Sequence, residues 1–215
     1  MQAQWSSDRE RAALVAAGDE RALASLCAEL HRPLCRVAEA YVGAGALAED
    51  LVQETWEAVI DHIASFEARS SLRTWVTRIL VNRAKTRLAR DGRTVSLEAA
   101  AEAGEDPTEA FGAGGFWRAA PAYAVGPEQA LVERQAAEWL GRALATLPTA
   151  QRTVVTLRDV EDWTSDEVCN ALGLSESNQR VLLHRGRTRL RAALEQALRA
   201  ERGEERAAEE RAQKP

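Results

Sequence analysis

The chain has 215 residues, and its 33 acidic and 28 basic side chains give a formal net charge of −5. A hydrophobic share of 46% is enough to bury a core in one or two domains, while an aromatic share of only 5% disfavours a β-sandwich or barrel. The longest uncharged stretch has nine residues, against the roughly 20 of a membrane helix. With three cysteines and no signal-like N-terminus, we expect a cytoplasmic, helical protein that makes no membrane contact of its own.

The N-terminal part predicts helices that are interrupted by glycine and proline. Apolar residues recur near helical spacing from Asp8 to Leu30, with a break at Gly18, which indicates two helices or one bent helix. Pro33 suits the first turn of a further helix that runs towards Tyr41. We therefore expect the chain to begin with a set of packed helices.

An acidic helix is expected next, from Ala48 to Ile63. Residues 37–68 hold seven acidic side chains and no Lys or Arg. Along the helix the acids fall at i, i+4, i+7 and i+11, opposite an apolar face; they are Asp50, Glu54, Glu57 and Asp61. A face of this kind is either a solvated surface or a docking surface for a basic partner.

The charge reverses in the following segment. Residues 69–93 hold eight basic side chains against Asp91 alone, and the apolar spacing predicts a long helix from Leu72 to Arg90. A basic stripe is typical of polyanion binding. Trp75 has the spacing of a core residue on this helix, and its alternative role is a stacking platform for a nucleic-acid base.

The middle of the chain is acidic and lacks a sustained hydrophobic period. Residues 96–126 are rich in Gly, Ala, Pro and acids, so we expect a flexible acidic linker that need not pack. Two small helical domains are predicted on either side of it, at 8–95 and 127–197, followed by a tail at 198–215 that is either disordered or a frayed helix end. The expected fold class is all-α.

The C-terminal domain contains a helix-turn-helix pattern. Thr164 or Ser165 can cap its first helix, and Gly173 suits the left-handed residue that ends that helix. Ser175 can cap the second helix, which continues into a basic run: residues 175–199 hold six Arg against two acids. An ordinary αα-hairpin is the alternative, but the capped turn and the basic extension favour DNA binding.

Three blocks in a fixed order carry a family resemblance: residues 48–56, residues 66–83, and the segment from Leu147 through the helix-turn-helix to Arg187. Together they resemble the sigma-70 family of bacterial RNA polymerase initiation factors, in particular its extracytoplasmic-function (ECF) group. The resemblance implies a sigma2-like helical bundle that binds core polymerase and the −10 element, and a sigma4-like domain that binds the −35 element. Such a factor directs polymerase to promoters and stabilises promoter melting.

The resemblance also assigns roles to individual residues. Asp50, Gln53 and Glu54 would dock on the coiled-coil of the polymerase's largest subunit, with the polymerase flap as a second docking point. The implied −10 contacts are Phe66, Arg69, Ser70, Ser71, Arg73, Thr74, Trp75, Asn82, Arg83 and Arg87. The implied −35 contacts are Ser175, Glu176, Ser177, Asn178, Gln179, Arg180, His184, Arg185 and Arg187.

Enzyme and metal chemistry find little support in the sequence. It has no Gly-rich phosphate loop, no nucleophile elbow and no zinc-protease pair, so we expect no catalytic residue and no cofactor. Cys27, His31 and Cys35 are spaced i, i+4, i+8, but a structural zinc ion takes four ligands. We expect these three to be buried small side chains, with no metal.

Two rival functions remain open at this stage. A free-standing helix-turn-helix regulator would explain residues 150–191 but not the acidic helix that precedes the basic one. A protein-interaction module would leave the basic segment unexplained. Within the sigma reading, an anti-sigma factor is a further partner that the resemblance allows.

Overall fold

A computed structural model describes the backbone of residues 2–92, 97, 100 and 138–212, and the side chains of this part except those of 2–6 and 200–212. Every regular element in the described part is helical, as the composition predicts. The chain divides into one unit of residues 1–104 and 149–183 and a second of residues 105–148 and 184–215. The linker predicted at 96–126 lies outside the described residues apart from positions 97 and 100.

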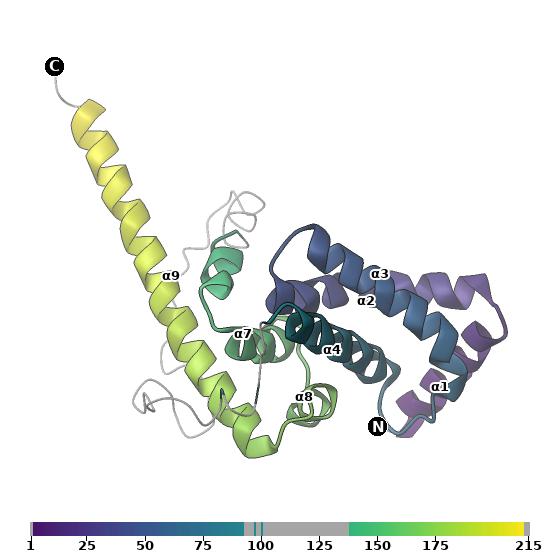
Figure 1. Cartoon of the computed structure of the whole chain (residues 1–215). Coiled ribbons are helices and arrows are strands. Elements are labelled where there is room, and N and C mark those ends of the chain that lie inside the picture. The colour runs from purple at the N-terminus through teal and green to yellow at the C-terminus, as the bar shows by residue number, and fades with distance from the viewer. Residues whose placement is uncertain (1, 93–96, 98–99, 101–137, 213–215) are drawn as a thin grey trace. The chain divides into compact units, whose positions relative to one another are not determined.

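The elements follow one another as helices and short helical turns (Figure 1). In chain order they are α1 (Gln2–Ala16), α2 (Glu20–Val42), α3 (Ala46–His62), η1 (Ile63–Ser65), α4 (Leu72–Arg90), α7 (Thr149–Val155), the π-helical turn η2 (Thr156–Val160), α8 (Ser165–Leu172) and α9 (Glu176–Ala212).

Helices α2, α3 and α4 pack against one another and form the core of the first unit (Figure 1). Their buried side chains are mainly Leu and Val, each of which contributes about 1.5–3 kcal/mol when fully buried. They include Leu26, Leu30, Leu34 and Val37 of α2, Leu51, Val52 and Val59 of α3, and Leu72, Val76, Leu80 and Val81 of α4. The expected acidic and basic helices are α3 and α4, so the two opposite charge blocks share one bundle.

Helix α2 passes through Pro33 without a break, so the expectation of a new helix at this proline is wrong. A proline inside a helix removes a backbone hydrogen bond and costs about 3 kcal/mol. Leu30 and Leu34 are both buried on either side of the proline. The continuous apolar face they belong to offsets that cost, which a local reading of proline does not take into account.

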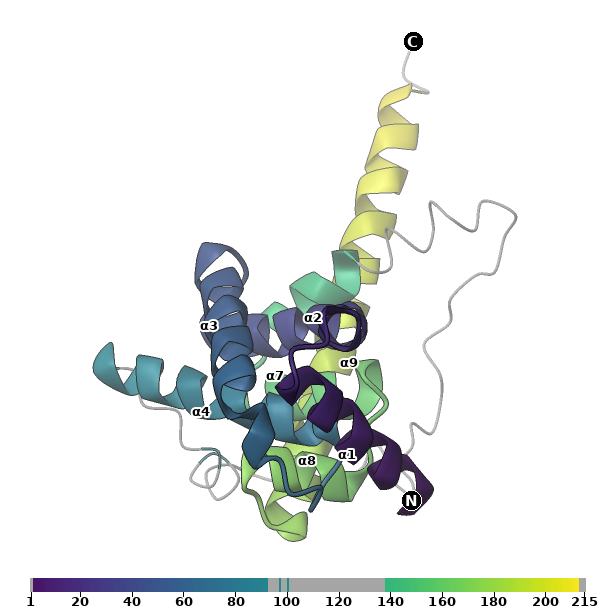
Figure 2. The ribbon, with the colours of Figure 1, turned by 90° about the vertical axis from the view of Figure 1, so that its right-hand side faces the viewer.

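The break predicted at Gly18 is present. Gly18 has φ +85 and separates α1 from α2. Asp19 then caps α2, because its side chain accepts hydrogen bonds from the backbone N–H groups of Arg21 and Ala22. Figure 2 shows α1 beside the segment where α3 ends and α4 begins, in agreement with its packing on η1 and α4.

Helices α7 and α8 belong to the same unit as the N-terminal bundle. α7 packs on α2, and α8 packs on α4. The side chains of Val154, Leu157 and Val168 are fully buried in this region, and Trp163 is the largest fully buried side chain of the described part. The first half of the helix-turn-helix domain therefore completes the core of the bundle.

The second unit contains residues 138–148 and the greater part of α9 among its described residues. Its buried apolar side chains are Ala143, Leu147, Leu190 and Leu194. Helix α9 continues to Ala212, beyond position 197, from which the sequence favoured a tail without fixed structure. The Ala, Glu and Arg that dominate residues 198–212 are strong helix formers, which agrees with the length of the helix.

Candidate polymerase and promoter-binding surfaces

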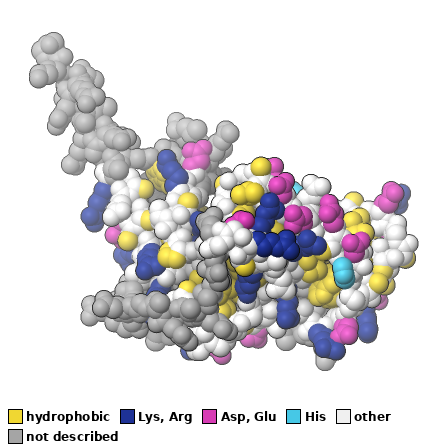
Figure 3. Space-filling model, viewed as in Figure 1, with side chains coloured by type: hydrophobic (Ala, Val, Ile, Leu, Met, Phe, Trp, Pro, Cys, Tyr) yellow, Lys and Arg dark blue, Asp and Glu magenta, His cyan; other side chains and the backbone are white. Residues whose placement is uncertain are grey.

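Helix α3 presents its acids beside the basic helix α4. Asp50 and Gln53 are exposed, and the Gln53 side chain donates to Glu57 on the next turn. Glu54 is half-buried and turned towards α4, where its carboxylate pairs with Arg83 at 3.5 Å and Arg87 at 3.2 Å. Figure 3 shows acidic side chains gathered next to basic ones on this face of the molecule. Of the three residues predicted for polymerase docking, Asp50 and Gln53 are therefore exposed on the surface, whereas Glu54 forms ion pairs with α4.

The segment between α3 and α4 forms a loop, residues 66–71, that carries several of the predicted −10 contacts. Phe66 is buried, and its ring meets that of Trp75 edge-on, with centroids 5.6 Å apart and planes at 64°. Such pairs are worth about 0.5–1.5 kcal/mol beyond the area they bury. Trp75 itself remains half-buried. Both alternatives for Trp75 therefore keep support: it packs on the core through Phe66 while part of its ring stays accessible.

Ser71 and Thr74 are buried and act within the fold. Ser71 is the N-cap of α4, and its Oγ accepts from the backbone N–H of Thr74 at 3.2 Å. The two hydroxyl oxygens are also 2.8 Å apart. An N-cap of this kind stabilises a helix by about 1 kcal/mol. These two predicted −10 contacts thus shape the start of α4 rather than present free hydroxyl groups.

The other predicted −10 residues differ in how far they are exposed. Arg69 is largely exposed and pairs with the neighbouring Glu67 at 2.6 Å. Ser70 is half-buried, and Asn82 is exposed on the outer face of α4. Arg69 and Asn82 are the predicted −10 contacts with the most open side chains.

Arg73 is held by the helix-turn-helix segment of the same unit. Its Nη2 donates to Glu167 Oε1 at 2.7 Å, and its guanidinium lies over the Trp163 ring at 4.6 Å from the ring centre. Burial would raise the pKa of Glu167, but the hydrogen bonds from Arg73 and from the Thr164 backbone outweigh that effect and lower the pKa below its ordinary value. A residue expected to contact the −10 element is here engaged by the domain expected to contact the −35 element.

Further contacts reinforce this packing of the helix-turn-helix segment on the bundle. Lys85 Nζ donates to the backbone carbonyl of Leu172 at the end of α8, at 3.1 Å. Arg152 donates from Nε and Nη2 to the carbonyl of Ala40 near the end of α2, at 2.9 and 2.6 Å. The side chains that make these contacts, together with Trp163 and Glu167, were not singled out from the sequence. Their partners are backbone carbonyls or side chains far away along the chain, which leave no local pattern.

The turn of the helix-turn-helix is built as predicted. Thr164 caps α8, and a reciprocal capping box is present: Glu167 Oε2 accepts from the Thr164 backbone N–H and hydroxyl, and Thr164 Oγ1 accepts from the Glu167 N–H. Gly173 ends α8 with φ +70 and ψ +37, a left-handed conformation that costs a residue with a Cβ about 1–2 kcal/mol. Ser175 Oγ then accepts from the Asn178 N–H and caps α9. The prediction covered only a cap at Thr164 or Ser165; the Thr-x-x-Glu spacing is the local signature that would have added Glu167.

The start of α9 carries the predicted −35 contacts. Glu176, Ser177 and Arg180 are exposed, and Glu176 and Arg180 form an i, i+4 ion pair at 2.6 Å. Asn178 is half-buried. Gln179 departs from the expectation: it is buried, at 3% exposed, and its Oε1 accepts from Ser165 Oγ of α8 at 3.0 Å. Gln179 lies on the side of α9 that packs against α8, so its side chain faces the interior of the motif.

His184, Arg185 and Arg187 lie further along α9 and are all half-buried. Basic side chains at the C-terminal side of a recognition helix suit contacts with phosphates, which position a protein on DNA without reading its bases. Long side chains of this kind bury their stems and keep their charged ends near the surface.

The cysteines show no metal-binding arrangement. Cys35 Sγ lies 3.7 Å from His31 Nε2, and the three cysteines are half-buried free thiols. Burial raises the pKa of Cys27 and of Cys35, and the nearby Glu39 adds to the effect at Cys35. Across the described residues no group of three or more His, Cys, Asp or Glu is placed to hold a metal ion. A separate search of the same residues finds no helix long and apolar enough to cross a membrane.

Comparison with known proteins places both halves of the chain in one family. Residues 26–94 match sigma-70 region 2, and residues 137–190 match sigma-70 region 4. The first match covers the acidic and basic helices, and the second covers the helix-turn-helix. The two matches follow the order expected from the sequence blocks.

Similar proteins of known sequence and structure agree. The chain is 28% identical over 172 residues to a probable RNA polymerase sigma factor of Haemophilus influenzae, a match covering 79% of this chain and 88% of that protein. It is 25% identical over 186 residues to the ECF RNA polymerase sigma factor SigW of Bacillus subtilis, covering 86% and 96%. Its fold resembles that of the sigma factor RpoE from Bartonella quintana, solved in complex with the anti-sigma factor NepR, with a TM-score of 0.55, 21% identity, and 80% and 95% of the two chains covered.

The family explains what the two charged surfaces and the helix-turn-helix have in common, since sigma factors combine polymerase docking with promoter recognition in one chain. This chain belongs to the sigma-70 family as an ECF sigma factor, which directs RNA polymerase to promoters.

Proposed function

We propose that the chain docks on core polymerase through the exposed acidic face of α3. Asp50 and Gln53 would make the direct contacts, on the coiled-coil of the polymerase's largest subunit. Glu54 would act from behind, because its carboxylate already binds Arg83 and Arg87. The observation that carries the proposal is this adjacency: an open acidic face and a basic helix share one bundle and one ion-pair network.

The −10 element would be bound by the loop at 66–71 and the outer face of α4. Arg69 and Asn82 are exposed and would reach the DNA, and Arg83 and Arg87, which now pair with Glu54, would bind phosphates. The accessible part of the Trp75 ring, held edge-on by the buried Phe66, would stack with an unstacked base. Ser70, Ser71 and Thr74 would contribute by shaping the loop and the helix start, with backbone groups as their contact points.

Arg73 requires a change of partner before it can serve the −10 element. It is now bound to Glu167 and stacked on Trp163. A backbone phosphate of DNA, like a carboxylate, offers the guanidinium a bidentate anionic partner, so promoter DNA can compete for it. We propose that α8 leaves α4 when polymerase and promoter bind, which frees Arg73 for the DNA.

The −35 element would be recognised by the first turns of α9 in the major groove. Glu176, Ser177, Asn178 and Arg180 form the side of the helix that can meet base edges. A further set would position the helix on phosphates: Ser175, His184, Arg185 and Arg187. Gln179 would hold α9 on α8 through Ser165.

Transcription in vitro tests the proposal. Core polymerase from a bacterium is mixed with promoter-length fragments, with and without this protein, and transcript start sites are mapped. Discrete starts only in its presence are expected, and Asp50→Lys is expected to abolish them. Glu10→Lys is the matched control, because it makes the same charge change at an exposed position on α1. Equal loss in both variants would count against the α3 docking surface.

The same experiment distinguishes the free-standing regulator. A regulator would bind duplex DNA by itself, in a salt-dependent manner, and would produce no new start sites with core polymerase. In the sigma function that we propose, the chain carries out no covalent chemistry and acts beside polymerase in the cytoplasm.

An anti-sigma partner stays a prediction. The RpoE protein of Bartonella quintana was solved with one, and we propose the same class of partner for this chain. Inhibition of promoter-directed transcription when a candidate partner is titrated into the holoenzyme would support it, and unchanged transcription would count against it.

A further inference from the structure

The loop at 66–71 contains a strained residue. Ala68 has φ +54, a left-handed conformation that residues with a Cβ avoid. Such a conformation persists where the surrounding structure over-determines it. The sequence of the loop offers no glycine at this position, so the constraint that holds Ala68 must come from its neighbours in space.

Helix α1 contacts the chain on both sides of this loop. It packs on η1, which precedes the loop, and on α4, which follows it (Figure 2). The loop is therefore anchored at its two ends by one and the same helix. Helix α3 packs on the same two elements, so α1 and α3 both contact the chain on either side of the loop.

The contact at the second end is a hydrogen bond from the backbone. The N–H of Leu72 donates to Oδ2 of Asp8 at 2.8 Å, across 64 positions of sequence. This N–H belongs to the first turn of α4, which has no partner for it within the helix. Ser71 caps a different N–H of that turn, that of Thr74. The start of α4 is thus capped twice, once locally and once by α1.

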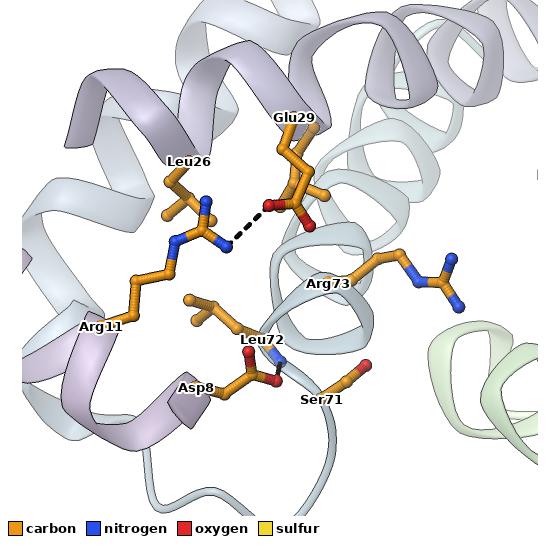
Figure 4. Close-up of a pocket in the computed structure, with 8 residues that line it drawn as sticks. Asp8, Arg11, Leu26, Glu29, Ser71, Leu72 and Arg73 are labelled. Carbon is orange, nitrogen blue, oxygen red and sulfur yellow. Dashed lines mark hydrogen bonds and ion pairs between the residues drawn. The ribbon is translucent and has the colours of Figure 1, made fainter. Parts of the chain in front are cut away.

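Helix α1, which carries Asp8, is also bound to α2 by side-chain contacts. Arg11, one turn further along α1, donates from Nη1 to Glu29 at 2.7 Å and from Nη2 to Ser25 at 3.2 Å. Figure 4 shows Arg11 reaching Glu29 on one side of a cavity of about 130 Å³ and Asp8 reaching the Leu72 backbone on the other. Ser71 and Arg73 also line this cavity, and the side chain of Arg73 extends away from it towards α8.

We propose that Asp8 is a positioning residue for −10 recognition. Its carboxylate fixes the first turn of α4 and, through it, the strained loop at 66–71, without touching the promoter itself. The inference rests on the proposed −10 role of that loop. It extends the functional region to α1, which lies outside the segment that matches sigma-70 region 2.

The test uses the holoenzyme on a promoter found in the transcription experiment, and on versions with the −10 or the −35 element scrambled. Open-complex formation is measured for Asp8→Ala, Asp8→Asn and the control Glu10→Ala, which alters an exposed neighbour on α1. Loss of a cap has a typical size of about fivefold in an equilibrium. Asp8→Ala is expected to lower discrimination at the −10 element by about that factor and to leave discrimination at the −35 element unchanged. Asp8→Asn, which keeps an acceptor oxygen, is expected to recover most of the loss.

Two outcomes would overturn the proposal. One is unchanged −10 discrimination in Asp8→Ala, and the other is an equal loss at both elements, which marks a general loss of folding. If Asp8→Ala melts well below the parent, amide hydrogen exchange at Leu72 carries the test: it must be faster in Asp8→Ala than in Asp8→Asn, which keeps the acceptor oxygen. Arg69→Ala tests separately whether the loop at 66–71 recognises the −10 element. If this variant keeps full −10 discrimination, the proposed function of the loop fails, whatever the result for Asp8.

Discussion

The two DNA-binding segments use the same residue types in different ways. In the −10 segment, Ser71 and Thr74 are buried and cap a helix, and Arg73 is bound to Glu167. In the −35 segment, Glu176 and Ser177 lie exposed on the first turns of α9. Many polar side chains of the −10 segment thus form hydrogen bonds and ion pairs within the fold, whereas those of the −35 segment are exposed to solvent. Substitutions in the first should change stability and recognition together, and those in the second should change recognition alone.

The largest change in stability is expected at Gln179, a −35 residue that is buried like the polar residues of the −10 segment. Gln179 lies among the −35 residues but is buried and bonded to Ser165. Gln179→Ala should lower the free energy of unfolding by about 1–3 kcal/mol, because it leaves a gap and removes the partner of a half-buried hydroxyl. Asn178→Ala should leave stability within about 0.5 kcal/mol and alter base preference in the −35 element. Urea unfolding and binding to a set of single-base promoter variants measure the two effects; a stable Gln179→Ala with altered preference would place Gln179 among the readers.

A smaller effect is expected at the N-cap of α4. Ser71→Ala should cost about 1 kcal/mol of stability, since Thr74 loses the acceptor for its backbone N–H. Ser177→Ala, a matched change on the exposed row of α9, should cost less than about 0.5 kcal/mol. Thermal melting of the two variants gives the comparison. Equal losses of stability in the two variants would contradict the view that polar side chains support the fold in the −10 segment and not in the −35 segment.

The ion pair between Arg73 and Glu167 should contribute less again. Both side chains are partly exposed, at 33% and 24%, and pairs of this kind are worth about 0.2–1 kcal/mol. A double-mutant cycle of Arg73→Ala and Glu167→Ala measures the coupling directly. In transcription, Glu167→Gln should raise open-complex formation at low polymerase concentration, because Arg73 is released more easily. A coupling of zero together with unchanged transcription would exclude a role for this contact.

The pH dependence of that pair is the smallest effect. The pKa of Glu167 is lowered in the folded chain, so its contribution to stability is complete above the ordinary pKa of glutamate, about 4.3. That contribution is lost as the pH falls through the lower, folded-state value. The difference in unfolding free energy between the parent and Glu167→Gln should therefore shrink below about pH 4. A difference that grows on acidification would have the wrong sign for a carboxylate stabilised by Arg73.

The sequence predicts local features of this fold well. The boundaries of α4, the caps at Thr164 and Ser175 and the left-handed Gly173 follow from residues that are neighbours in the chain. Helical periodicity and capping chemistry act over a few residues, so they leave a direct trace in the sequence. Pro33 shows the limit of such rules, since the burial of a whole helix face outweighs the local preference of a proline.

The candidate surfaces are harder to predict because exposure depends on distant packing. Glu54 and Gln179 have the right residue types and spacing for partners outside the chain, yet each binds a residue within it. The contact between Asp8 and Leu72 joins residues 64 positions apart, and nothing near either of them indicates the other. Periodicity can give the face of a helix, but the neighbour that covers this face is known only from the fold.

The two carboxylate oxygens of Glu167 have separate partners. Oε2 accepts from Thr164 and closes the capping box, while Oε1 accepts from Arg73. When Arg73 leaves for another anion, the start of α8 therefore keeps its own bonds and stays intact. The contact between Arg73 and Glu167 can therefore break and form again while α8 keeps its N-terminal cap, so that the helix-turn-helix reaches the promoter already folded.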